Sequence, residues 1–188
     1  MLELEPTAAG WADIALRDVE ALLSDHAHCE KKAAQQAMSL LHALADRDEV
    51  VVRLARLAEQ EAEHLRRVIE AIHSLGMHLR PDTTNAYAAA LAREVNDTID
   101  RLIVAALIEA RSHERLALLT LGLAARADLA NLVPLFEELR ACEAGHAHTY
   151  LQIAELVCDG PRVEARLPVW LAREAKAIAM VTPRAAIH

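Results

Sequence analysis

Two Glu-x-x-His pairs, each preceded by a single glutamate one long helix earlier, constrain this chain more than any other feature. The two sets have the same composition and order: Glu30 with Glu61 and His64, then Glu109 with Glu143 and His146. Four carboxylates and two imidazoles on four helices are the ligands with which a four-helix bundle holds two metal ions in its core. The pattern therefore predicts a helical bundle with a dinuclear metal site.

The composition favours an all-α fold. Alanine and leucine supply most of an apolar content of 54%, aromatic residues make up 3%, and five glycines and six prolines leave little material for turns. Residues with a high strand propensity do not form alternating runs. The 188 residues suit one domain with a sizeable core. We therefore expect a single ferritin-like domain over residues 1–188, with a bundle core at about 20–158 and additional short terminal helices.

Helix start and stop residues divide the chain into segments. The expected helices cover about 11–22 continuing to 45, then 48–75, 97–121, 128–157 and 163–180. Asp46 is the expected N-cap of the second long helix and Gly76 its C-cap. The third long helix should end near Gly122, and Pro134 either kinks the fourth or marks its true first turn. Residues 77–96 are long enough to cross the bundle, which gives a ferritin-like topology.

The turns support the ligand assignment. The midpoint between Glu30 and the first Glu-x-x-His pair falls near residue 46, in the first predicted turn. The midpoint between Glu109 and the second pair falls near residue 127, in the second turn. Residues equidistant from the turn of an antiparallel hairpin lie at the same height, so each single glutamate should face its own Glu-x-x-His pair.

Two alternatives compete with this set. A third pair, Glu70 and His73, lies on the same expected helix as Glu61. Glu70 is nine residues beyond Glu61, about 180° around the helix, so we expect the third pair to be solvated. Glu114 competes with Glu109, but it lies about 140° away around the helix and fits the midpoint less well.

Other side chains near the expected ligands are candidates for supporting roles. His26 and Tyr150 share a helix face with Glu30 and Glu143, and each has ordinary core packing as an alternative. Asp25 is one candidate partner for a ligand imidazole. Cys29 and Cys142 immediately precede a glutamate of the set, and small apolar filling is their favoured role.

Charge identifies what the set would bind. Four carboxylates in one core layer would repel one another and would be costly to desolvate. Two divalent cations would cancel their four negative charges. Carboxylate and imidazole ligands with open positions suit iron or manganese, whereas structural zinc prefers thiolates.

The segments around these residues resemble the MiaE-type tRNA hydroxylases, bacterial non-haem di-iron monooxygenases. The matching segments are SDHAHCEKKAA (24–34), EQEAEH (59–64), IEARSHER (108–115) and EAGH (143–146), within a resemblance that covers about residues 11–160. The resemblance implies hydroxylation of the isopentenyl side chain of 2-methylthio-isopentenyl-adenosine, next to the anticodon in tRNA. It implies two iron ions held by the six residues above, dioxygen as co-substrate and an unidentified electron-donor protein.

The acidity of the chain bears on an RNA substrate. The net charge is −8, whereas RNA binding rests on phosphate contacts from lysine and arginine. Local basic patches are candidate contacts: Lys31/Lys32, Arg66/Arg67, Arg111/Arg115, and Arg162, Arg166, Arg173 and Lys176. Solvated helix faces are the alternative for each patch. A di-iron oxygenase for a small molecule and an iron-storage protein are the competing functions, and the oligomeric state stays open.

The expected location is the cytoplasm, without a membrane span. No apolar run reaches the roughly 20 residues of a transmembrane helix. The amino terminus, MLELEP, is acidic and unlike a signal peptide. Three cysteines without a CxxC pair indicate a reducing compartment.

Overall fold

The structure, a computed structural model, describes residues 2–188, and these residues form helices without any strand. The elements in chain order are α1 (Trp11–Ala15), α2 (Val19–Ala43), α3 (Asp48–Ser74), α4 (Ala86–Ala92), α5 (Thr98–Ala124), the 3₁₀ helix η1 (Ala130–Leu132), α6 (Val133–Val157) and α7 (Gly160–Met180). The all-α fold class predicted from the sequence is confirmed. The chain separates into two compact units, which are described in turn; that they form a single domain stays a prediction.

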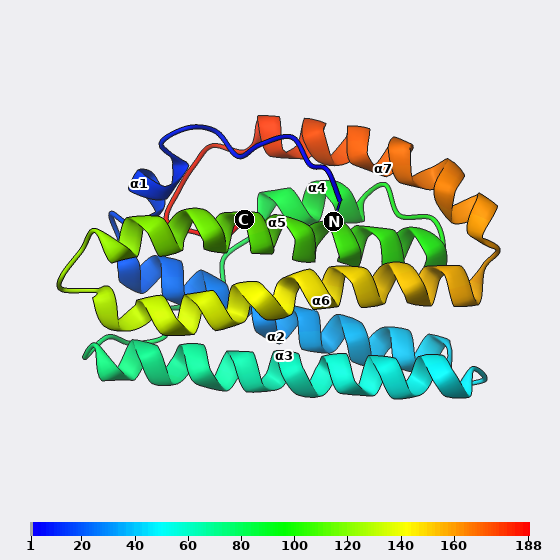
Figure 1. Cartoon of the computed structure of the whole chain (residues 1–188), viewed down its shortest axis with the longest axis horizontal. Coiled ribbons are helices and arrows are strands. Elements are labelled where there is room, and N and C mark those ends of the chain that lie inside the picture. Colours follow the sequence, from blue (N-terminus) through cyan, green and yellow to red (C-terminus); the bar gives the residue numbers. More distant parts are fainter. Residues whose placement is uncertain (1) are drawn as a thin grey trace. The chain divides into compact units, whose positions relative to one another are not determined.

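The first of these units contains residues 14–83 and 184–187, and its centre is the antiparallel hairpin of α2 and α3 (Figure 1). The buried apolar residues of α3 recur at helical spacing, and include Leu54, Leu57, Val68 and Ile72. This stripe faces the core, as the sequence pattern predicted. Asp18 caps α2 by accepting a hydrogen bond from the Ala21 backbone N–H.

The start of α3 differs from the prediction. Its N-cap is Arg47 and not Asp46, and no side chain accepts a hydrogen bond there. Asp48 and Glu49 instead lie in the first turn, where their negative charges favour the positive end of the helix dipole.

Gly76 directly follows Leu75, the C-cap of α3, so the predicted C-cap is one residue too late. The Gly76 φ of 68° is left-handed, and the N–H of Met77 donates to the carbonyl of Ile72 at 3.1 Å. This is the arrangement of a Schellman motif, which favours glycine. The segment after Gly76 contains Arg80, whose guanidinium forms ion pairs with Asp18 and Glu20 of the same unit.

The other unit contains residues up to Asp13, residues 84–183 and His188, and its centre is the hairpin of α5 and α6. Asp97 caps α5 by accepting from the N–H of Asp100. The helix continues past Gly122 to Ala124, because Leu123 extends its apolar face and is 1% exposed. The helix therefore ends two residues later than predicted.

Two prolines mark helix starts in this unit. Pro134 lies in the first turn of α6, which resolves the two alternatives left by the sequence. Pro161 lies in the first turn of α7, where Asp159 caps the helix by accepting from the N–H of Arg162. Proline suits the first turn because its missing N–H would have no helical partner there. The helix consequently begins at Gly160, three residues before the predicted start.

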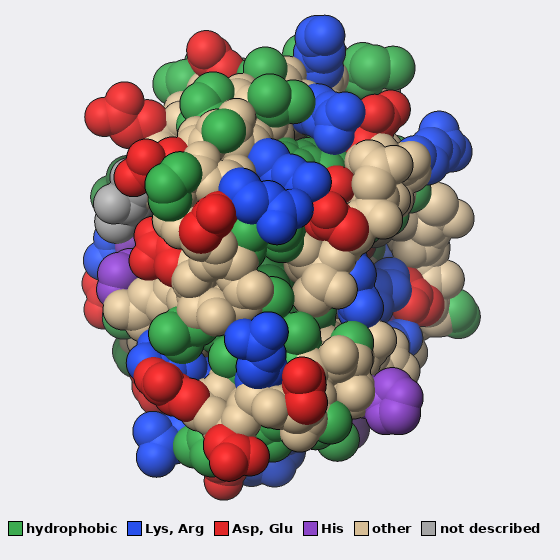
Figure 2. Space-filling model, turned by 90° about the vertical axis from the view of Figure 1, so that its right-hand side faces the viewer, with side chains coloured by type: hydrophobic (Ala, Val, Ile, Leu, Met, Phe, Trp, Pro, Cys, Tyr) green, Lys and Arg blue, Asp and Glu red, His purple; other side chains and the backbone are tan. Residues whose placement is uncertain are grey.

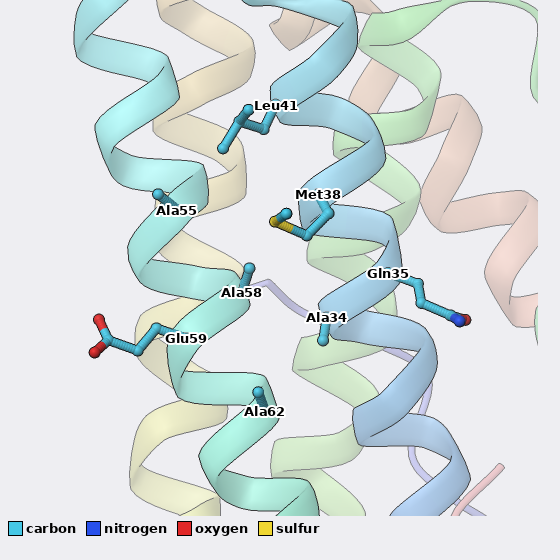
Figure 3. A pocket seen from close by; sticks show the side chains of 8 residues that line it. All are labelled: Ala34, Gln35, Met38, Leu41, Ala55, Ala58, Glu59 and Ala62. Atoms are coloured by element: carbon cyan, nitrogen blue, oxygen red, sulfur yellow. The ribbon is translucent and has the colours of Figure 1, made fainter.

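A shallow groove of about 620 Å³ runs between α2 and α3 (Figure 3). Half of its eight lining residues are alanines: Ala34, Gln35, Met38, Leu41, Ala55, Ala58, Glu59 and Ala62. Ala34 lies one turn after Glu30, and Ala58 lies one turn before Glu61. The groove therefore begins within one helical turn of two expected ligands.

Replacing Gly76 by alanine should destabilise the protein. A side chain in the left-handed region costs about 1–2 kcal/mol, and the added methyl would meet no neighbour within 4 Å that adds to this cost. Urea denaturation of Gly76→Ala should show this loss. Gly145→Ala is the matched control: that site also has open space but is helical, so stability should rise by about 0.5–1 kcal/mol. A loss in both variants would contradict the conformational explanation.

Candidate metal centre

The α2–α3 hairpin brings Glu30, Glu61 and His64 together, and all three are at most 5% exposed. Nδ1 of His64 lies 3.4 Å from Oε2 of Glu30 and 3.8 Å from Oε2 of Glu61. Glu30 comes from α2 and the other two residues from α3. The predicted opposition of a single glutamate and a Glu-x-x-His pair across this hairpin is thus present.

A second imidazole contacts Glu30. Nε2 of His26 lies 2.7 Å from Oε1 of Glu30, and the His26 side chain is 1% exposed. Burial alone would raise the pKa of Glu30, but the neighbouring imidazoles of His26 and His64 oppose this effect, and the net pKa is well below its usual value. The carboxylate is therefore held as an anion in a site closed to water.

The two residues next to His26 and Glu30 have other partners. The Asp25 carboxylate accepts from the N–H of Ile187 at 2.8 Å and lies 3.4 Å from the Arg184 guanidinium. Asp25 is thus engaged with residues 184–187 of its own unit. Burial raises the pKa of the Cys29 thiol well above its usual value, so this cysteine stays neutral. The favoured role of Cys29 as small filling agrees with this environment.

The α5–α6 hairpin carries the second set. Glu109 of α5 is 5% exposed, and Glu143 and His146 of α6 are 2% and 3% exposed. One carboxylate oxygen of Glu143 and one ring nitrogen of His146 lie within 4.8 Å of each other. Tyr150, two turns after Glu143, is fully buried.

The α2–α3 hairpin therefore gathers two buried carboxylates and one imidazole, and the α5–α6 hairpin buries residues of the same types. Buried carboxylates are found paired with cations or bound to metals, because an uncompensated charge is costly to desolvate. A divalent cation in each hairpin would balance its two carboxylates. Oxygen and imidazole donors without thiolate are the ligands of iron and manganese enzymes. These buried Glu/His clusters are candidate metal-binding sites.

The competing residues lie elsewhere. Glu70 and His73 are exposed, and Glu70 pairs with Arg66 on the surface of α3. The prediction that this third pair is solvated is confirmed. Glu114 is half-buried and accepts hydrogen bonds from the backbone N–H and hydroxyl of Thr7. It also pairs with Arg111, so its charge is already balanced by neighbours of its own unit.

The predicted basic patch of Arg111 and Arg115 is wrong, because both side chains are buried. Arg111 is 0% exposed and donates to Oε1 of Glu174 from Nε at 2.9 Å and Nη2 at 2.7 Å. The hydroxyl of Tyr87 donates to the same oxygen at 3.0 Å. The Arg115 guanidinium lies 4.7 Å from the Trp11 ring, and burial together with the charge of Arg111 lowers the pKa of Arg115 to about 10.

Most other predicted basic patches are paired with carboxylates of their own unit. These pairs are Lys31 and Lys32 with Asp82, Arg66 with Glu63 and Glu70, Arg166 with Asp97 and Asp100, and Arg173 with Glu94. The lysine hydrogen bonds, led by Lys32, lower the pKa of Asp82 to about 2. Arg162 and Lys176 are exposed. On the face drawn in Figure 2, basic and acidic side chains are interspersed.

Long helical hairpins with buried Glu/His sets define a class: the ferritin-like carboxylate metalloproteins. Comparison with known proteins identifies the particular family within it. The sequence model of the family described as tRNA-(MS[2]IO[6]A)-hydroxylase (MiaE) matches residues 2–188. The chain belongs to this family, as its motifs predicted.

Two similar proteins support the assignment. A tRNA 2-(methylsulfanyl)-N(6)-isopentenyladenosine(37) hydroxylase from Pseudomonas putida is 36% identical over 154 residues, which are 79% of this chain and 73% of the relative. A solved structure described as protein 43 with aldehyde deformylating oxygenase activity, from Synechococcus, has a TM-score of 0.90 and 32% identity. That match covers 100% of this chain and 96% of the other, and the predicted ferritin-like fold is confirmed.

No helix within residues 2–188 is both long enough and apolar enough to cross a bilayer.

Replacing Arg111 by methionine should strongly destabilise the protein. Removing one partner of a buried ion pair costs about 3–5 kcal/mol, because Glu174 would keep an uncompensated charge. Urea denaturation of Arg111→Met should show this loss. Adding Glu174→Gln removes the charge and keeps an acceptor for Tyr87, so the double variant should recover part of the stability. A double variant that is less stable than Arg111→Met would contradict the charge explanation.

Proposed function

We propose that this protein hydroxylates the isopentenyl side chain of 2-methylthio-isopentenyl-adenosine in tRNA, using a di-iron centre and dioxygen. The observation that carries the proposal is the buried glutamate and Glu-x-x-His set in each of two hairpins, within a member of the MiaE family. The similar protein from Pseudomonas putida is named for an isopentenyladenosine at position 37 of tRNA. That name supports the same nucleoside class as substrate here.

The proposed iron ligands are the six residues of the two sets: Glu30, Glu61, His64, Glu109, Glu143 and His146. Each hairpin would hold one ferrous ion, since two carboxylates balance one divalent charge. In ferritin-like di-iron proteins, a ligand set of this composition holds both ions.

Bound iron would supply the activation of dioxygen: with two electrons from a donor protein and two protons from solvent, one oxygen atom would enter a C–H bond and the other would leave as water. The chain's own residues have three tasks. Glu30 and Glu61 would supply anionic oxygen ligands. His64 would fill one coordination position through a ring nitrogen, so other positions on the ion would stay available for further ligands. The burial of all three keeps bulk water away from the reaction.

An RNA substrate must bind a chain of net charge −8. Because so many basic side chains are paired within the chain, we propose that tRNA makes few phosphate contacts. Each phosphate contact adds about one to the slope of log affinity against log salt. Binding should therefore depend weakly on salt, and recognition should rest on the prenylated base and its neighbours in the anticodon loop.

Anaerobic loading should give about two iron atoms per chain. His64→Ala and His146→Ala should each weaken one of them, since each removes the imidazole of one hairpin. Iron would be measured by elemental analysis after equilibrium dialysis. The control is His73→Ala, which removes an exposed imidazole from α3 and should leave the iron content unchanged. Full occupancy in a variant that lacks both His64 and His146 would refute the ligand assignment.

Iron-loaded protein should convert prenylated adenosine in tRNA to its hydroxylated form when dioxygen and a two-electron donor are present. Nucleoside mass spectrometry of the digested tRNA would show a gain of one oxygen atom, labelled when ¹⁸O₂ is used. Glu61→Ala should abolish the product, because it removes a buried ligand carboxylate. Glu70→Ala, an exposed carboxylate on the same helix, should retain activity. No product with a verified diferrous protein would remove this function.

An aldehyde is the second candidate substrate. The Synechococcus structure, similar over the whole chain, carries the name of an aldehyde deformylating oxygenase activity. The same iron-loaded protein would be given an aldehyde, with gas chromatography of the products. Turnover of the aldehyde without turnover of prenylated tRNA would favour this alternative.

A further inference from the structure

We propose that Lys31 and Lys32 form a binding site for a phosphate of the RNA substrate, and that Asp82 fills this site in the free protein in place of the phosphate. The inference rests on the proposed function, because it takes tRNA to be the substrate. It assigns one contact with the RNA backbone and the carboxylate of this chain that competes for it.

The Asp82 carboxylate is bound by one ammonium group on each oxygen. Nζ of Lys31 lies 2.9 Å from Oδ2, and Nζ of Lys32 lies 2.7 Å from Oδ1. These bonds, led by that of Lys32, lower the pKa of Asp82 to about 2, so the position favours an anion. A phosphate diester likewise presents two charged oxygens and carries one negative charge. Lysine binds phosphate as a point charge, so the same two ammonium groups suit it.

His28 holds Lys31 in place independently of Asp82. Nε2 of the His28 ring lies 2.8 Å from the carbonyl oxygen of Arg80. A carbonyl can only accept a hydrogen bond, so this nitrogen carries the ring proton. Nδ1 then accepts from Nζ of Lys31 at 3.3 Å. Because the imidazole bonds both the backbone and the lysine, Lys31 keeps its position when the carboxylate leaves.

Asp82 can leave this site without disturbing the segment that carries it. The N–H of His78 donates to Glu20 at 2.9 Å, and the N–H of Arg80 donates to the Ser24 hydroxyl at 3.0 Å. These contacts fix the backbone before Asp82 on α2. Within residues 2–188, the Asp82 carboxylate itself bonds to the two lysines and accepts from no backbone N–H. Rotation of one side chain is therefore enough to open both ammonium groups to a ligand.

The ion pairs are exchangeable because they lie at the surface. The side chains of Lys31 and Lys32 are 37% and 43% exposed, and that of Asp82 is 32% exposed. Ion pairs at this exposure contribute little to stability, because water and salt screen them. A phosphate that replaces the carboxylate substitutes one negative charge for another. The two lysines are consequently paired both before and after the RNA binds.

The place of the two lysines on α2 relates the site to the proposed metal centre. They directly follow Glu30, which is 4% exposed, whereas both lysines reach solvent. A phosphate bound there would lie on the outer side of the helical turn whose inner side carries a proposed iron ligand. Arg166 offers a less suitable site, because its partner Asp97 also caps α5 and could leave only at the expense of that cap.

The test compares tRNA binding by the iron-loaded protein and its variants, using fluorescence anisotropy of a labelled tRNA between about 50 and 200 mM salt. Asp82→Asn removes the competing charge and keeps the shape of the side chain. Lys31→Gln together with Lys32→Gln removes the site. Asp128→Asn is the matched control, because Asp128 is also an exposed carboxylate bonded to a basic side chain, Arg126, and its loss changes the net charge equally.

Asp82→Asn should bind tRNA more tightly than the wild type. The slope of log affinity against log salt should steepen by about one, which is about a fourfold change in relative affinity across this salt range. The double lysine variant should bind more weakly, with a shallower slope. Adding Asp82→Asn to that variant should tighten binding no more than Asp128→Asn does in the wild type, since no ammonium group remains to be opened.

A gain in Asp82→Asn no larger than that in Asp128→Asn would overturn the proposal, because it would show a general effect of charge. Unchanged binding in the double lysine variant, or no tRNA binding by the wild type, would overturn it as well. Hydroxylation is measured in the same samples by nucleoside mass spectrometry. Absent hydroxylation together with the expected binding differences would remove the proposed reaction and leave the phosphate site standing.

Discussion

Burial of carboxylates is the constraint on which the other features of this protein depend. Glu30 and Glu61 in one hairpin, and Glu109 and Glu143 in the other, are each at most 5% exposed. Helices can carry such residues inward only where their charge is compensated, because an isolated buried carboxylate would become protonated. Around Glu30, two imidazole nitrogens lie 2.7 Å and 3.4 Å from its carboxylate oxygens. A cation in each hairpin would provide this compensation and would make the folding of the hairpins dependent on metal.

The burial of the candidate ligands of α3 could be predicted from the sequence because it follows from the helix period and the position of the turn. Helical spacing places Glu61 and His64 on the inward stripe of α3 and Glu70 on the opposite face. The turn then sets the height at which Glu30 meets them across the hairpin. The helix face on which a residue lies and its height in the hairpin are both local properties, since they depend only on the helix period and on the position of the turn. The same locality explains why the end of α3 near Gly76 was predictable, whereas Pro134 left two alternatives that the structure resolves.

The wrong prediction for Arg111 and Arg115 has a physical origin. Residues on almost every side of α5 are buried, so periodicity along this helix does not separate an inner from an outer face. The partner of Arg111 is Glu174, sixty-three residues later in the chain, and no local pattern connects them. A buried arginine and a solvent-facing one have the same sequence signature until the covering segment is known. The errors at Asp46 and Gly122 are smaller, because capping preferences are worth only about 1 kcal/mol and packing overrides them.

The pairing of basic residues links the fold to substrate selection. Lys31, Lys32, Arg66 and Arg166 are held by carboxylates of their own unit, so an RNA phosphate would have to compete with these carboxylates for each one. That competition lowers the gain from each phosphate contact and disfavours non-specific RNA binding. An acidic enzyme of this kind would discriminate through the modified base, because an apolar prenyl group is the feature that distinguishes its target from other nucleosides. Weak attraction to the RNA backbone is then an advantage, since it leaves the prenyl group and the neighbouring bases to determine the residence time.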